Sequence, residues 1–210
     1  MSSGHYFDPD PGSVSRPRRV TLHLPDLSLE LATDSGVFSA DQIDAGTKLL
    51  LLDGPEPSDS AGPLLDLGCG YGPIAITLAR RCPTAQVWAI DVNERARQLC
   101  VQNAASAGVS DRVHVARPDD VPASVQFGQI WSNPPIRIGK TPLHELLIRW
   151  LKRLDPDGSA HLVVQKHLGA DSLARWLEGE GFRTERRVSR MGYRLLDVTP
   201  APDQDEPKER

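Results

Sequence analysis

Apolar and polar residues alternate in two short runs near the start of the chain. Leucine or valine occupies every second position over 20–24 and again over 27–31. A period of two residues is typical of a strand with one buried face, and Pro25-Asp26 between the runs supplies turn residues. The pattern therefore predicts a β-hairpin, and the apolar residues that follow predict a helix over 43–52.

A second rhythm starts at Pro63, where short apolar segments alternate with longer amphipathic ones. It predicts strands over 64–67, 86–90, 113–116, 127–131 and 160–164, and helices over 73–81, 94–107, 141–154 and 172–178. Two final strands, over 182–188 and 193–198, form a hairpin around Met191-Gly192. Alternating strands and helices build a parallel sheet with helices on both faces. We therefore expect an α/β fold with a mostly parallel, seven-stranded sheet and an antiparallel last hairpin strand.

A loop rich in proline, serine and glycine over 54–62 separates the two patterns. We divide the chain there into an N-terminal extension of hairpin and helix over 1–60 and a main domain over 61–200. The charged, proline-containing segment over 201–210 is expected to be a disordered tail.

The composition excludes several classes of protein. The 210 residues carry a net charge of −4, so any nucleic-acid binding needs a local basic patch rather than a basic surface throughout. No apolar run approaches the roughly 20 residues of a membrane span, and the N-terminus has no apolar signal core. Three cysteines and six histidines match no zinc spacing. We expect a cytoplasmic protein with reduced thiols, no metal and no membrane contact.

A glycine-rich loop, Asp66-Leu67-Gly68-Cys69-Gly70-Tyr71-Gly72, joins the first core strand to its helix. Glycines let a backbone approach a ligand that any Cβ would push away. Asp91 ends the next strand, where an acidic side chain can accept hydrogen bonds from both hydroxyls of a ribose. The carboxylate of Asp66 beside the loop suits a cationic ligand group and would repel a pyrophosphate. The loop therefore favours a nucleoside cofactor without phosphates.

This loop and its distal acid resemble motifs of the class I methyltransferases, which have a Rossmann-like fold and use S-adenosylmethionine. The resemblance implies that Asp66, through its backbone or a water molecule, and the Gly68–Gly72 loop hold the methionine part. Asp91 would hold the ribose, and Val92-Asn93 would flank the adenine. Asp119 or its neighbour Asp120 is the expected contact to the adenine amino group. The implied cofactor-binding set is Asp66, Leu67, Gly68, Cys69, Gly70, Gly72, Asp91, Val92, Asn93, Asp119 and Asn133.

A second motif, Asn133-Pro134-Pro135-Ile136, follows the strand over 127–131. The Asn133 side-chain oxygen and the Pro134 carbonyl can each accept a hydrogen bond from an amino group. Two acceptors placed out of the amino plane favour a pyramidal nitrogen whose lone pair points at a methyl donor. The proline rings stiffen the loop, and Ile136 offers apolar contact to the target. Positioning of this kind is most of what a methyl transfer needs.

The resemblance narrows to the small-subunit (16S) ribosomal RNA guanine-N2 methyltransferases in their short, single-domain form. This narrower resemblance rests on the sequence motifs in three segments, 34–39, 44–47 and 133–140. The motifs His5-Tyr6-Phe7 and Gly192-Tyr193 also fit the family. It implies a guanine 2-amino group of 16S rRNA as target, with rRNA or the small ribosomal subunit as partner. Arg137 and Lys140 would contact phosphates that flank a flipped base. Because Ile136 is not aromatic, the candidates for a platform under the base are Tyr6, Phe7 and Phe38.

Two alternatives remain open. The same chemistry could act on a protein glutamine or on adenine of DNA or RNA, although protein-glutamine enzymes of this type often have tyrosine at the position of Ile136. A chain of another class would be a non-catalytic RNA-binding or ribosome-assembly module. A module without activity need not retain Asp66, Asp91 and Asn133 together, which favours an enzyme. The oligomeric state and the target nucleotide are not predicted.

Overall fold

The computed structural model describes residues 13–201. The predicted platform candidates Tyr6 and Phe7, and the predicted tail beyond Ala201, lie outside the described residues. The main sheet contains β3 (Leu64–Leu67), β4 (Val87–Ile90), β5 (Val113–Ala116), β6 (Phe127–Ser132), β7 (Leu154–Gln165), β8 (Phe182–Arg190) and β9 (Tyr193–Pro200).

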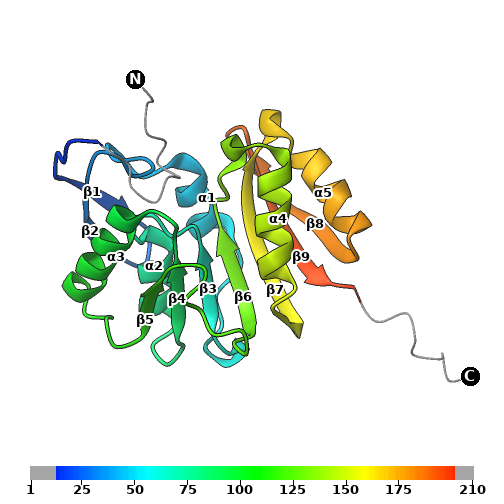
Figure 1. Cartoon of the computed structure of the whole chain (residues 1–210), viewed down its shortest axis with the longest axis horizontal. Coiled ribbons are helices and arrows are strands. Elements are labelled where there is room, and N and C mark those ends of the chain that lie inside the picture. The colour runs from blue at the N-terminus through cyan, green and yellow to red at the C-terminus, as the bar shows by residue number, and fades with distance from the viewer. Residues whose placement is uncertain (1–12, 202–210) are drawn as a thin grey trace, which may run out of the picture.

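Across the sheet the strands follow the order β5-β4-β3-β6-β7-β9-β8 (Figure 1). The pairings from β5 to β7 are parallel, whereas β9 runs antiparallel to both β7 and β8. The predicted fold class is therefore confirmed. A separate two-stranded sheet pairs β1 (Arg18–His23) with β2 (Ser28–Thr33), as the alternating leucines predicted.

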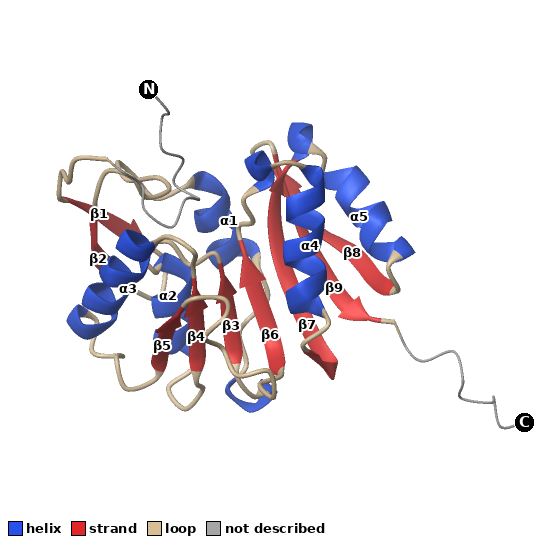
Figure 2. Ribbon diagram, viewed as in Figure 1, coloured by secondary structure: helices blue, strands red, loops and turns tan. Residues whose placement is uncertain are grey.

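Five α-helices of the described chain cover both faces of the main sheet (Figure 2). They are α1 (Ala45–Asp53), α2 (Pro73–Arg81), α3 (Glu94–Ser106), α4 (Lys140–Leu151) and α5 (Ala170–Gly179). Residues from α4 and α5 pack on one face of the sheet, and residues from α1, α2 and α3 pack on the other. Successive residues of a strand point to opposite faces of the sheet. In β3, Leu64 packs in the hydrophobic cluster with α1, α2 and α3, and Leu65 packs in the cluster with α4 and α5.

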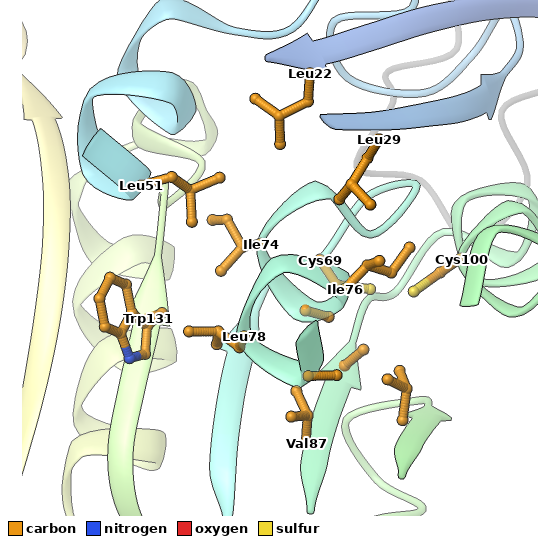
Figure 3. Close-up of a cluster of buried hydrophobic side chains, with 14 of the residues drawn as sticks. Leu22, Leu29, Leu51, Cys69, Ile74, Ile76, Leu78, Val87, Cys100 and Trp131 are labelled. Atoms are coloured by element: carbon orange, nitrogen blue, oxygen red, sulfur yellow. The ribbon is translucent and has the colours of Figure 1, made fainter. Parts of the chain in front are cut away.

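The N-terminal hairpin shares a hydrophobic core with the main domain. Leu22 and Leu29 of the hairpin belong to the same buried cluster as Leu51 of α1 and Ile74 of α2 (Figure 3). A buried amide reinforces this packing: Asn103 of α3 accepts a hydrogen bond from the Ala32 N–H (2.7 Å) and donates to the Ala32 carbonyl (2.8 Å). The hairpin and α1 are therefore packed against the main domain.

One predicted helix is too long. The apolar stripe predicted a helix over 141–154, but α4 ends at Leu151, and Leu154 begins β7 opposite Phe127 of β6. The Phe127 N–H donates to the Arg153 carbonyl (2.8 Å). The segment after Leu151 therefore pairs with β6 as a strand, although its apolar residues still follow helical spacing. The strand predicted over 160–164 consequently extends over 154–165. The pairing of β7 with β6 shifts register between Phe127 and Gln129, and this irregularity accommodates the turn-forming residues 155–158 of β7.

Candidate functional site

A cavity of about 410 Å³ opens where β3, β4 and β6 end. Parallel strands end at the same edge of a sheet, which brings together motifs far apart in the sequence. The glycine loop after β3, Asp91-Val92 after β4 and residues 133–137 after β6 all line this cavity. Phe38, Gln165 and Tyr193 line it as well.

The glycines of the loop have different surroundings. Gly68 and Gly70 have positive φ angles of 79° and 54°, and a Cβ added to either would meet no atom within 4 Å. Both line the cavity, so their bare backbone forms a wall that a ligand can approach. Gly72 instead packs against α3, where a Cβ would lie 2.7 Å from Cys100 Sγ. Gly68 and Gly70 therefore leave room for a ligand in the cavity, whereas Gly72 allows α2 to pack closely on α3.

Asp91 connects the glycine loop to the start of α3. Its Oδ2 accepts a hydrogen bond from the Gly70 N–H (2.9 Å), and its Oδ1 accepts one from the Asn93 N–H (2.8 Å). Burial raises the pKa of this carboxyl, and the two backbone hydrogen bonds oppose that shift. Each carboxylate oxygen has two lone pairs, so Asp91 can hold the loop and still accept hydrogen bonds from a ligand in the cavity.

Asp66 lies behind the loop rather than in the cavity lining. It is fully buried, and its Oδ2 accepts a hydrogen bond from the Ala75 N–H of α2 (2.9 Å). Its Oδ1 has no partner among the described residues. Burial raises the pKa of Asp66 to about 8. Its carboxyl therefore ties the first turn of α2 to β3.

The remaining predicted cofactor contacts divide into two groups. Leu67 and Val92 line the cavity. Asn93 is outside that lining; it caps α3 by accepting a hydrogen bond from the Ala96 N–H (3.1 Å) and donates to the Gly36 carbonyl (2.8 Å). The Asp119 carboxylate is paired with Arg149 (2.8 Å) and its side chain is 77 % exposed. Its neighbour Pro118 lines the cavity instead.

All three cysteines are buried, and none forms a disulfide bond in the described structure. Cys69 and Cys100 direct their sulfurs toward one another beneath the loop (Figure 3), and Cys82 is also buried and unbonded. A hydrogen bond with Cys100 and burial raise the pKa of Cys69 well above its usual value. Burial also raises the pKa of Cys82 to about 11, so Cys69 and Cys82 are kept in their neutral, unreactive form. Over residues 13–201, no cluster of metal-ligating side chains occurs and no helix is long and apolar enough to cross a membrane.

All four residues of the Asn-Pro-Pro-Ile motif line the cavity. The Asn133 amide nitrogen donates to Asp44 Oδ1 (2.6 Å) and to Thr47 Oγ1 (3.0 Å). No described residue donates to the Asn133 oxygen, at the other edge of the planar amide. The Pro134 carbonyl accepts from the Ile136 N–H (2.8 Å), which leaves one lone pair on that oxygen. The motif therefore lines the cavity and carries two oxygens that can still accept hydrogen bonds.

Sequence patterns did not mark two further polar residues of the lining as site residues. Gln165, at the end of β7, donates from its Nε2 to the Tyr193 hydroxyl at the start of β9 (3.1 Å). Register between β7 and β9 places these residues opposite one another, and both line the cavity. The only sequence signal at either position is Tyr193, as part of the Gly192-Tyr193 match. Phe38, which is 38 % exposed, is another aromatic residue of the lining.

The basic residues are unequally placed. Arg137 lines the cavity, whereas Lys140 is exposed at the start of α4, outside the lining. Several arginines of β8 are paired with carboxylates: Arg186 with Asp171, Arg187 with Asp197 and Arg190 with Asp53. Their positive charge is thus partly neutralised.

Comparisons with known proteins place the chain in a family. The model of the methyltransferase small domain matches residues 28–196. The uncharacterized protein YbxB of Bacillus subtilis is 36% identical over 179 residues, which cover 84% of this chain and 88% of that protein. The ribosomal RNA small subunit methyltransferase C of Shewanella amazonensis is 32% identical over 166 residues, which cover 75% of this chain and 46% of that protein.

A solved structure shares the fold. It is the T. thermophilus 16S rRNA N2 G1207 methyltransferase in complex with AdoMet and guanosine, which matches with a TM-score of 0.74 at 22% identity. The match covers 88% of this chain and 50% of that protein. The chain thus spans about half the length of the ribosomal RNA methyltransferases that it resembles.

Proposed function

The chain belongs to the methyltransferase small domain family, and from this premise we propose that it methylates the exocyclic 2-amino group of a guanine in 16S ribosomal RNA. The protein is an S-adenosylmethionine-dependent methyltransferase. When bound, the cofactor supplies a methyl group attached to a positively charged sulfur. Residues of this chain would hold that group and its acceptor in two halves of one cavity.

The half of the cavity at β3 and β4 suits the cofactor. The wall made by Gly68 and Gly70 leaves the space that a side chain would fill, and Asp91 lies beside it as a hydrogen-bond acceptor for ribose hydroxyls. Val92 offers an exposed apolar surface for the adenine. Asp66 is too deeply enclosed for direct contact, so its part in holding the ligand is to fix the loop and α2.

The observation that carries the proposal is the pair of acceptors at Asn133 and Pro134. Both residues line the cavity that the glycine loop also lines, and the Asn133 nitrogen is already engaged by Asp44 and Thr47. An amino group that donates its two hydrogens to these oxygens keeps its lone pair for the methyl carbon. A hydroxyl or thiol acceptor has a single hydrogen and would leave one oxygen unused. The motif therefore favours an amino group as acceptor.

The far side of the cavity suits a planar base. Phe38 and Tyr193 supply aromatic surface, and Ile136 supplies apolar contact. Arg137, at the cavity, provides positive charge for a neighbouring phosphate. The name of the Shewanella amazonensis relative supports small-subunit ribosomal RNA as the substrate. The T. thermophilus structure, a 16S rRNA N2 G1207 methyltransferase with guanosine bound, supports guanine as the target base.

Methyl transfer to defined substrates tests the proposal. The protein is incubated with tritiated-methyl S-adenosylmethionine and, in separate reactions, with unmodified 16S rRNA, purified small ribosomal subunits and ribosomal protein. Nucleoside and amino-acid mass spectrometry then identify the product. We expect N2-methylguanosine in one of the RNA fractions, and far less of it with Asn133→Ala over the same incubation time. Label in methylglutamine or methyladenine would overturn the target, and RNA binding without any transfer would support a non-catalytic module.

A further inference from the structure

We propose that Asp44 is a positioning residue that determines which edge of the Asn133 amide faces the reacting nitrogen. The inference rests on the proposed amino-group chemistry, whichever molecule carries that amino group. Asp44 lies 89 positions before Asn133, in the segment that leads into α1, and also lines the cavity.

The assignment follows from what a carboxylate can do. Asp44 Oδ1 lies 2.6 Å from Asn133 Nδ2, and an ionised carboxylate can only accept hydrogen bonds. A half-turn of the amide would bring two oxygens to that distance, where they repel. The Asn133 nitrogen must therefore face Asp44, and the amide oxygen must face away from it. Thr47 Oγ1 adds a second acceptor for the same nitrogen (3.0 Å).

Asp44 is itself held in place by the start of α1. It is the N-cap of that helix, and its Oδ1 also accepts a hydrogen bond from the Thr47 N–H (2.9 Å). This first turn packs tightly: a Cβ added to Gly46 would lie 2.7 Å from Tyr193 Cε1. Asp44 Oδ1 thus accepts hydrogen bonds from both the helix cap, at the Thr47 N–H, and the Asn-Pro-Pro-Ile motif, at Asn133 Nδ2. A cap alone needs only the bond to Thr47, so the bond to Asn133 is additional.

The arrangement matters most during the reaction. In the proposed transfer the nitrogen lone pair forms the new N–C bond, and the electron pair of the breaking C–S bond stays with sulfur. The nitrogen then carries positive charge until it loses a proton to water. The Asn133 oxygen is a stronger acceptor because its amide nitrogen donates to a carboxylate, since hydrogen bonds in a chain polarise one another. Loss of Asp44 should therefore reduce the transfer rate more than it reduces cofactor binding.

Two substitutions at position 44 separate positioning from capping. Serine is a good N-cap but is too short to reach Asn133, so Asp44→Ser keeps the cap and removes the positioning bond. Asparagine keeps an oxygen that can accept from both Thr47 and Asn133, so Asp44→Asn removes only the charge. Thr47→Val removes the second acceptor with nearly unchanged volume. Each is compared with wild type by single-turnover methylation of the substrate that wild type modifies, and by calorimetric titration with cofactor.

We expect Asp44→Ser to slow single turnover by about 10-fold or more and Asp44→Asn to stay within a few-fold of wild type, with cofactor affinity within a few-fold in both. In the Asn133→Ala background, Asp44→Ser should cause little further loss, because the two residues act as a unit. The NMR signal of the Asn133 side-chain NH₂ should shift in Asp44→Ser.

An Asp44→Ser rate within twofold of wild type would overturn the inference, and so would a loss that persists fully in the Asn133→Ala background. These outcomes are distinct from failure of the proposed function. If wild type methylates a glutamine or an adenine, the guanine proposal fails while the comparison at position 44 can still be made on that substrate. If wild type transfers no methyl group to any amino group, both fail, although an unshifted NH₂ signal would by itself reject the positioning bond.

Discussion

Asp66 shows how burial sets the chemistry of a single carboxyl. It is enclosed between β3 and α2, accepts one backbone hydrogen bond and has an Oδ1 without a partner among the described residues. Burial raises its pKa from the ordinary 3.8 to about 8, so the folded protein holds this group mostly neutral at pH 7. The carboxyl is then compatible with the apolar core around it.

A pH dependence of stability follows from that shift. Because the pKa is higher in the folded state, the folded protein keeps a proton that the unfolded chain loses between pH 4 and pH 8. The stabilisation is full below the unfolded pKa and is lost as pH rises through about 8. We expect the free energy of unfolding, measured with urea at pH 5, 7 and 9, to fall more steeply in wild type than in Asp66→Asn. Equal slopes for the two proteins would show that Asp66 ionises normally.

Asp91 should matter for cofactor affinity in two ways. Asp91→Ala removes the proposed ribose acceptor and also the two bonds that hold the Gly70 and Asn93 N–H groups. Loss of charge-assisted hydrogen bonds of about 1.5–3 kcal/mol corresponds to a roughly 10- to 150-fold weaker affinity. Isothermal titration with S-adenosylmethionine measures this change. Asp119→Asn is the matched control: since Asp119 is exposed and paired with Arg149, we expect its affinity to equal that of wild type.

At the scale of elements, the glycine loop offers a comparison between two alanine substitutions. Gly70→Ala meets no protein atom, so the fold should lose only the roughly 1–2 kcal/mol of a left-handed residue while cofactor binding is blocked. Gly72→Ala adds a clash with Cys100 to a positive φ of 93°, so it should destabilise the protein more. Thermal unfolding with and without cofactor measures both effects. If the cofactor raised the unfolding temperature of Gly70→Ala as much as that of wild type, the cofactor would not bind at the glycine loop.

The turn before α4 and the first residue of that helix carry the proposed contact with RNA phosphates. Arg137→Ala combined with Lys140→Ala should weaken RNA binding and lower the slope of log affinity against log salt by roughly 1–2, with cofactor affinity unchanged. Lys152 caps the opposite end of α4, so Lys152→Ala should leave the slope as it is. Filter binding over a range of salt concentrations makes the comparison. A slope that stays constant in the double variant would mean that neither side chain contacts phosphate.

The elements differ in how far the sequence could predict them. Strand β3, its loop and α2 were predicted at their observed bounds, because apolar runs, glycines and proline mark local structure. The junction of α4 and β7 was not, because Leu154 fits a helical stripe and only pairing with Phe127 makes it a strand residue. The same limit applies to the site. The resemblance grouped Asn133 with the glycine loop in one cofactor site, whereas the Asp44–Asn133 and Gln165–Tyr193 contacts depend on packing and register between distant segments.

At the scale of the whole molecule, the cavity draws on both ends of the described chain. Phe38 and Asp44 come from the segment between the hairpin and α1, and Tyr193 comes from the last strand of the sheet. The hairpin belongs to the same core as α1 and α2, and Asn103 joins it to the glycine loop by donating to the Tyr71 carbonyl (2.9 Å). A loss of packing between the hairpin and the main domain would therefore be transmitted to the site.

The central claim is that this cavity binds S-adenosylmethionine at the glycine loop and transfers its methyl group to an amino nitrogen held by Asn133. Asn133→Ala removes the acceptor and little volume, so the cofactor half of the cavity should remain intact. The most direct measurement is the single-turnover methylation rate of this variant beside its cofactor affinity. We predict a rate lower by about 10²-fold or more, as for loss of one preorganised transition-state hydrogen bond, with affinity within a few-fold of wild type. Methylation by Asn133→Ala at the wild-type rate would contradict the claim.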